Sequence, residues 1–61
     1  MKILRLADVI ATTGLSRAMI YELIKDQRFP KQVPLTSHCV GWVEEEVQDW
    51  IMQRVAERDE V

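Results

Sequence analysis

The two side chains of this sequence with the greatest intrinsic reactivity, His38 and Cys39, are neighbours. Nucleophilic catalysis needs a base within hydrogen-bond reach of the nucleophile and a third group that orients this base. Neighbouring residues of an extended strand point to opposite faces, so His38 and Cys39 cannot form such a pair. One His and one Cys are also too few for a closed zinc site. We therefore interpret Cys39 as an ordinary small strand residue.

A run of three carboxylates, Glu44 to Glu46, is the other candidate for chemistry. Consecutive residues of a helix diverge by about 100°, so these side chains do not converge on one point. Their position suits the positive end of a helix dipole instead. Gly14 and Gly41 are the only glycines, which leaves no Gly-rich loop for a phosphate. We expect no enzyme, no metal and no cofactor.

The basic side chains point to a polyanionic partner. Residues 1–33 carry six Lys and Arg against three Asp and Glu, a net charge of +3, whereas residues 34–61 carry two against seven, a net charge of −5. Such an asymmetry is typical of one half that faces nucleic acid and another that faces solvent. The alternative is that both halves are merely solvated faces.

The predicted DNA-binding residues lie in a short helix and just after it. Ser16 is a good N-cap and can contact a phosphate as well. Arg17 can form a bidentate pair with guanine or clamp a phosphate, and Tyr21 can reach the backbone or a thymine methyl group. Half-buried packing is the alternative for Tyr21, and Met19 is expected to flank the core. Glu22 repels phosphate unless it accepts from a cytosine amino group. The residues selected on these grounds are Ser16, Arg17, Ala18, Tyr21, Lys25, Arg28 and Lys31.

Two helices are predicted in the first half of the chain, at about residues 5–12 and 16–26. Leu6, Val9 and Ile10 recur at helical spacing, and Gly14 can end that helix in the left-handed conformation. Phe29-Pro30 prevents the second helix from continuing.

The second half of the chain is expected to hold a hairpin at about 32–42 and a helix at about 44–57. The apolar period changes to two after Gln32, with a three-residue tip at residues 36–38 and Pro34 on an edge strand. The predicted core comprises Leu6, Val9, Ile10, Leu15, Ile20, Leu23, Ile24, Phe29, Val33, Leu35, Val40, Trp42, Val47, Trp50, Ile51 and Val55.

A chain of 61 residues is expected to form a single domain, residues 1–61, of marginal stability. Its longest near-apolar stretch, residues 3–11, is interrupted by Arg5 and Asp8 and is too short to cross a membrane. The expectation is a cytoplasmic protein that a partner or a second copy stabilises further.

Two short helices joined by residues 12–15 fit a helix-turn-helix pattern. The chain also carries the joint pattern TGLSR, IY, LIK and FPK, followed by VGW, EV and WI, over residues 4–54. Together these segments resemble the AlpA-like family of small prophage regulatory proteins. The resemblance implies a mainly α fold with a small β-hairpin, namely a winged helix-turn-helix of the MerR and excisionase type.

The resemblance also implies a function and further site residues. It implies a sequence-specific, DNA-binding transcriptional regulator of prophage origin that is associated with the bacterial nucleoid. The alternatives are an excisionase-like architectural factor that directs an integrase, and a protein-binding adaptor without DNA affinity. Double-stranded DNA is the expected partner, with self-association on adjacent sites or an integrase as additions. Residues 36–38 fall at the tip of the family's wing, which adds Ser37 and His38 to the predicted site; there the family commonly has Gly and Arg.

Overall fold

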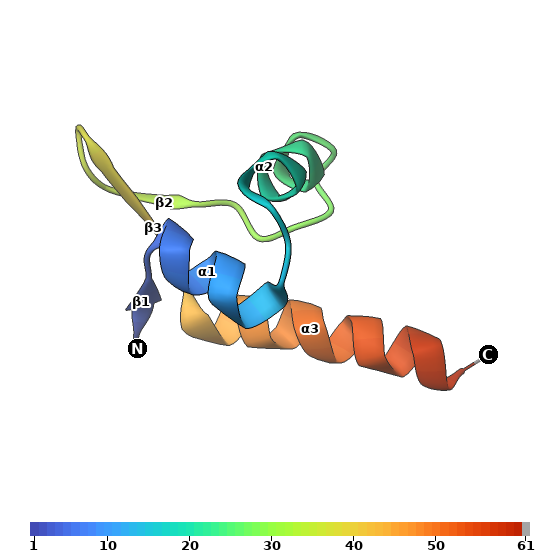
Figure 1. The fold of residues 1–61 in the computed structure, drawn as a ribbon. Helices are drawn as coiled ribbons and strands as arrows, with labels where there is room; N and C mark the ends of the chain where they lie inside the picture. Colours follow the sequence, from blue (N-terminus) through green and yellow to red (C-terminus); the bar gives the residue numbers. More distant parts are fainter. Residues whose placement is uncertain (61) are drawn as a thin grey trace.

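The computed structural model describes residues 1–60 and contains three helices and three short strands (Figure 1). Val61, the last residue of the expected domain, lies outside the described residues. In chain order the elements are β1 (Ile3–Leu4), α1 (Leu6–Thr13), α2 (Arg17–Lys25), β2 (Val33–Thr36), β3 (Cys39–Val43) and α3 (Glu44–Asp59). These elements confirm the predicted fold class of a mainly helical chain with a small hairpin. The strand β1 was not predicted.

Local hydrogen bonds define the turn between α1 and α2. Gly14 adopts a left-handed conformation with φ 75° and donates its N–H to the carbonyl of Ile10 at 2.8 Å, which ends α1. The hydroxyl of Thr13 accepts from the N–H of Leu15 at 3.2 Å. Ser16 then caps α2, because its Oγ accepts from the N–H of Met19 at 3.1 Å. The direction of α2 relative to α1 is therefore set by these few residues.

A second left-handed residue, Gln27, ends α2. Its φ is 59°, although it has a side chain. The N–H of Gln27 donates to Ile24 at 2.9 Å and that of Arg28 donates to Leu23 at 2.8 Å, the two bonds of a Schellman motif. Glycine is the usual residue at this position because it has no Cβ to clash.

Replacing Gln27 with glycine is expected to stabilise the protein. Relief of the left-handed strain outweighs the extra entropy of glycine in the unfolded chain, for a net gain of about 0.5–1 kcal/mol. In a domain of this size the melting temperature rises by about 3–6 °C, which calorimetry can measure. The matched control, Gln27→Ala, retains a Cβ and should show no increase. A lower melting temperature for Gln27→Gly would contradict this account.

The sheet is antiparallel with the strand order β1-β3-β2. Thr36 pairs with Cys39, so the tip of the hairpin has two residues, Ser37 and His38, and the expected three-residue tip is wrong. The hydroxyl of Thr36 accepts from the N–H of His38 at 3.2 Å, which closes this tighter turn. As predicted, the strand with Pro34 lies at an edge, and a register shift follows Pro34.

One face of the sheet is buried and the other is open. Leu4 and Trp42 pair on the buried face, so Gly41 and its partner Val33 lie on the other face. A Cβ at Gly41 would collide with the side chain of Ile3 and would lie 3.1 Å from the carbonyl oxygen of Leu4. The close approach of β1 therefore requires glycine at this position.

The core is smaller than predicted. Its buried side chains are Leu4, Val9, Ile20, Phe29, Trp42 and Val47. Val33 and Leu35 were predicted to be buried, but they are 37% and 44% exposed. Both lie on the open face of the sheet, because Val33 pairs with Gly41 and the side chain of Leu35 lies over Gly41. The other predicted core residues are half-buried: Leu6, Ile10, Leu15, Leu23, Ile24, Val40, Trp50, Ile51 and Val55.

Both tryptophans hold the connection between α2 and β2. The indole N–H of Trp42 donates to the carbonyl of Pro30 at 3.1 Å, and that of Trp50 donates to the carbonyl of Arg28 at 2.7 Å. The ring of Phe29 meets the ring of Trp50 edge-on, with centroids 4.9 Å apart. The connection that ends at the hairpin is thus fixed to the sheet and to α3.

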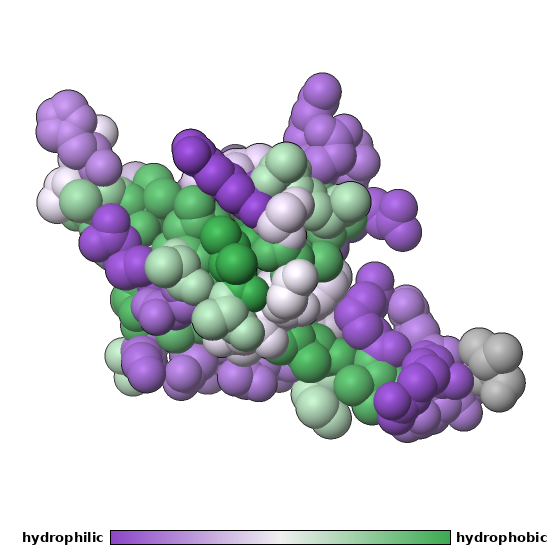
Figure 2. All heavy atoms as spheres, in the orientation of Figure 1, coloured by the Kyte–Doolittle hydropathy of each residue, from purple (hydrophilic) through white to green (hydrophobic). Residues whose placement is uncertain are grey.

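The elements divide between two sides of the molecule. Figure 1 shows α2 and the hairpin tip on one side of α1 and α3 on the other. Figure 2 shows hydrophilic side chains at the hairpin tip, around α2 and along the end of α3, with hydrophobic atoms gathered between them. The first turn of α3 carries Glu44, Glu45 and Glu46. The most acidic segment of the chain is therefore remote from α2.

Candidate nucleic-acid interface

The start of α2 exposes Ser16, Arg17 and Ala18. A hydroxyl has one donor and two acceptor positions, and Ser16 uses one acceptor position for the cap. Its O–H is thus free to donate to an anion. The backbone N–H groups of the first helical turn point the same way, toward the positive end of the helix dipole. The start of α2 is therefore suited to a negatively charged group.

Arg17 and Tyr21 lie one helical turn apart and touch. The guanidinium carbon of Arg17 is 5.9 Å from the centre of the Tyr21 ring, a cation–π contact. Tyr21 is half-buried, and its ring meets Trp42 edge-on with centroids 6.3 Å apart. Tyr21 therefore packs as its alternative interpretation expected, while its contact with DNA stays a prediction. The Arg17 side chain is exposed, and its guanidinium group packs on the half-buried ring of Tyr21.

The outward face of α2 includes a residue that sequence reasoning misplaced. Met19 was expected to flank the core, but it is 47% exposed. Ala18, Glu22 and Lys25 are exposed along the same helix, whereas Ile20 is fully buried. The helical angle was an available signal, because Met19 lies about 100° from Ile20 on the side away from Ile24. The exposed face thus has apolar, acidic and basic members.

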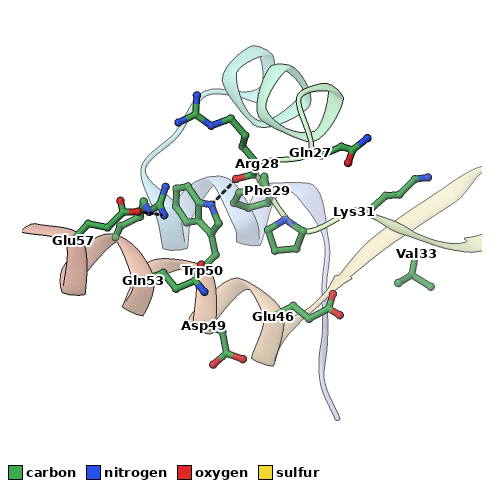
Figure 3. A pocket seen from close by; sticks show the side chains of 12 residues that line it. Gln27, Arg28, Phe29, Lys31, Val33, Glu46, Asp49, Trp50, Gln53 and Glu57 are labelled. Carbon is green, nitrogen blue, oxygen red and sulfur yellow. Dashed lines mark hydrogen bonds and ion pairs between the residues drawn. The ribbon is translucent and has the colours of Figure 1, made fainter.

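The basic residues at the end of α2 and in the loop after it line two hollows. Lys25 and Lys31 line one shallow hollow together with Ile24, Gln27 and Phe29. Arg28 lines a groove on the α3 side, which Lys31 also borders. In Figure 3 the side chains of Arg28 and Lys31 extend away from α3.

Acidic side chains from α3 form the far wall of that groove. They are Glu46, Asp49 and Glu57, and the Trp50 ring extends from α3 toward the carbonyl of Arg28 (Figure 3). Among residues 1–60 the ion pairs are Lys2 with Glu44, Arg54 with Glu57, and Arg58 with Asp59. Within this described part of the chain, Arg17, Lys25, Arg28 and Lys31 therefore form no ion pair. Their charges are available to an external anion.

The wing tip, Ser37 and His38, is exposed and is separate from the α2 residues in the fold. It lies on the same side of α1 as α2 (Figure 1). The predicted site residues therefore form two clusters, one at α2 and its following loop and one at the tip of the hairpin.

The structure of residues 1–60 also allows the catalytic, metal-binding and membrane-spanning alternatives to be examined. Cys39 is half-buried in β3, while His38 belongs to the turn. Among residues 1–60, no three His, Cys, Asp or Glu side chains are grouped as metal ligands. No helix within these residues is both long enough and apolar enough to cross a bilayer.

Two helices joined by a tight turn, then a β-hairpin and a third helix, define a winged helix-turn-helix protein. The sequence model described as "Prophage CP4-57 regulatory protein (AlpA)" matches residues 2–55. This chain belongs to that family, as its motifs indicated.

Two relatives are similar over most of the chain. The DNA-binding transcriptional activator AlpA of Escherichia coli (strain K12) is 42% identical over 59 residues, which cover 87% of this chain and 84% of AlpA. The uncharacterized protein ORF88 of Enterobacteria phage P4 is 44% identical over 57 residues, which cover 93% of this chain. The match spans 65% of the length of the phage protein.

Proposed function

We propose that this protein is a sequence-specific, DNA-binding transcriptional regulator of prophage type. The observation that carries the proposal is the set of exposed cations at α2 and in the loop that follows it, which no acid of residues 1–60 neutralises. The start of α3 lies on the other side of α1 from α2, and of its three carboxylates only Glu46 lines the groove of Arg28 and Lys31 (Figure 1). The name of the E. coli relative, a DNA-binding transcriptional activator, agrees with this proposal.

In the proposed complex, α2 enters the major groove with its N-terminal residues at the base edges. Arg17 reads a guanine or clamps a phosphate, and Ser16 donates its hydroxyl to the backbone. Ala18 and Met19 offer apolar contact to a thymine methyl group, and Tyr21 acts through its support of Arg17. The phosphate contacts come from Lys25, Arg28 and Lys31, and from Ser37 and His38 in the wing.

The small size of the chain suggests that it does not act alone. A single module of this size buries about 600–1,000 Å² on DNA, which limits its affinity. A second copy on an adjacent site, or a DNA-bound protein such as an integrase, would raise the effective affinity. These partners are part of the proposal, and they place its action in the bacterial cytoplasm, on the nucleoid.

Selection of bound duplexes from a random DNA pool at about physiological salt tests the proposal, because non-specific attraction is weak there. We expect an enriched sequence motif. Two half-sites with inverted symmetry would indicate a dimeric regulator, whereas tandem repeats with DNA bending would favour the excision factor. No enrichment, together with no salt-dependent binding to any duplex, would overturn the proposal in favour of the protein-binding adaptor.

A further inference from the structure

Arg5 lies outside the predicted site, yet it connects the helix-turn-helix to the wing. It precedes α1 as the N-cap residue, and its backbone N–H donates to the carboxylate of Asp8 at 3.2 Å. Its side-chain Nε donates to the carbonyl oxygen of Val40 at 3.1 Å. Val40 is the second residue of β3, next to the hairpin tip.

The hydrogen bond from Arg5 to Val40 lies on a part of the β3 edge that no strand covers. β1 pairs with Trp42 and Val43 only, so β3 has no strand neighbour on that edge nearer to the tip. On the other edge, Val40 pairs with Pro34 of β2. Arg5 supplies the donor for the exposed edge, where a carbonyl would otherwise depend on water. The Arg5 side chain therefore links the start of α1 to the wing.

Most donors of the Arg5 guanidinium group are left unused. A guanidinium group has five N–H donors in a planar fork, and the Val40 bond uses the one at Nε. Arg5 is exposed, and it forms no ion pair with any acid of residues 1–60. The start of α1 lies beside the base of the hairpin (Figure 1). The wing tip and α2 both lie on one side of α1.

We propose that Arg5 is a further DNA-contact residue, which holds the wing through Nε and binds a backbone phosphate through its two terminal amino groups. This inference rests on the proposed function. Arginine suits the role because its fork matches two phosphate oxygens while Nε remains bonded elsewhere. In this way one side chain contacts both the wing and the DNA backbone between the wing and α2.

The salt dependence of DNA binding tests this proposal. Each phosphate contact contributes about 0.9 to the slope of log K against log salt. We expect Arg5→Gln to bind a labelled duplex about tenfold more weakly and to lower this slope by about 0.9. The matched control is Arg58→Gln, which removes the same charge near the end of α3, where Arg58 pairs with Asp59. Its slope should equal that of the unaltered protein.

A second variant separates the effect of the positive charge from that of the hydrogen bond to Val40. Arg5→Lys retains the charge but lacks Nε, so the slope should be retained while the affinity falls severalfold. If Arg5→Gln keeps the slope of the unaltered protein, Arg5 does not bind phosphate and the inference is wrong. If the unaltered protein itself shows no salt-dependent binding, the proposed function fails and this inference fails with it.

Arginine modification decides the matter if Arg5→Gln does not fold. The unaltered protein is treated with phenylglyoxal with and without duplex DNA, and the modified residues are identified by mass spectrometry. DNA should slow modification of Arg5 severalfold and leave Arg58 unchanged. Equal rates at Arg5 with and without DNA would overturn the inference.

Discussion

Replacing Trp42 with alanine is expected to remove a large part of the free energy of unfolding at 25 °C. Trp42 is fully buried and is the largest buried side chain of the described core. It supports Tyr21 and donates to the carbonyl of Pro30, so it joins the sheet to α2 and to the loop that follows. Truncation of such a residue costs about 3–5 kcal/mol. The whole stability expected of a 61-residue chain is about 3–9 kcal/mol.

Circular dichroism and urea unfolding measure this effect, and two variants serve as controls. Trp42→Phe retains an aromatic ring but leaves the carbonyl of Pro30 without its donor, so the loss should be smaller, about 1–3 kcal/mol. Met52→Ala removes a side chain that is 61% exposed and should leave the stability nearly unchanged. A Trp42→Ala protein that melts cooperatively within a few degrees of the unaltered protein would contradict this account of the core.

Replacing Arg17 with alanine is expected to weaken specific DNA binding by about 1–3 kcal/mol, or roughly 5- to 150-fold. The side chain is exposed and is supported by Tyr21, so its loss removes a contact to DNA and leaves the core intact. The cation–π contact itself is worth only about 0.5–1 kcal/mol at an exposed position. The melting temperature should therefore change by a few degrees at most. Titration of the duplex enriched by selection, together with thermal unfolding, measures both quantities.

Arg17→Lys distinguishes the two possible contacts of Arg17. Lysine retains the charge but loses the bidentate geometry. If Arg17 reads a guanine, the lysine variant loses preference at one base position; if it clamps a phosphate, affinity falls equally for all sequences and the preference is retained. Unchanged affinity and unchanged selectivity of Arg17→Ala would show that α2 does not dock through its N-terminus.

Much of the helical structure could be predicted because the signals are local. Gly14 and Ser16 end one helix and begin the next through hydrogen bonds within a few residues. These bonds depend on side-chain type and hardly on the rest of the fold. The end of α2 shows the limit, since Gln27 takes the left-handed conformation that glycine usually occupies and therefore gives a weak signal.

The strands were harder to predict because their burial depends on distant partners. Ile3–Leu4 is too short to show a period, and Leu4 is buried because it pairs with Trp42. Val33 and Leu35 have the alternation of a half-buried strand, but no part of the sequence indicates which face of the sheet the helices cover. The structure leaves their face open.

From the chain alone we could predict the class of protein, the helix boundaries near Gly14 and Ser16, and the separation of positive and negative charge. These features depend on residue types and short spacings, which survive in any chain conformation. The folded arrangement was needed to show that α3 lies opposite α2, that Tyr21 packs half-buried against Trp42, and that Arg5 reaches Val40. Those contacts join residues whose proximity depends on packing, since the hydrophobic core brings together segments that no local signal relates.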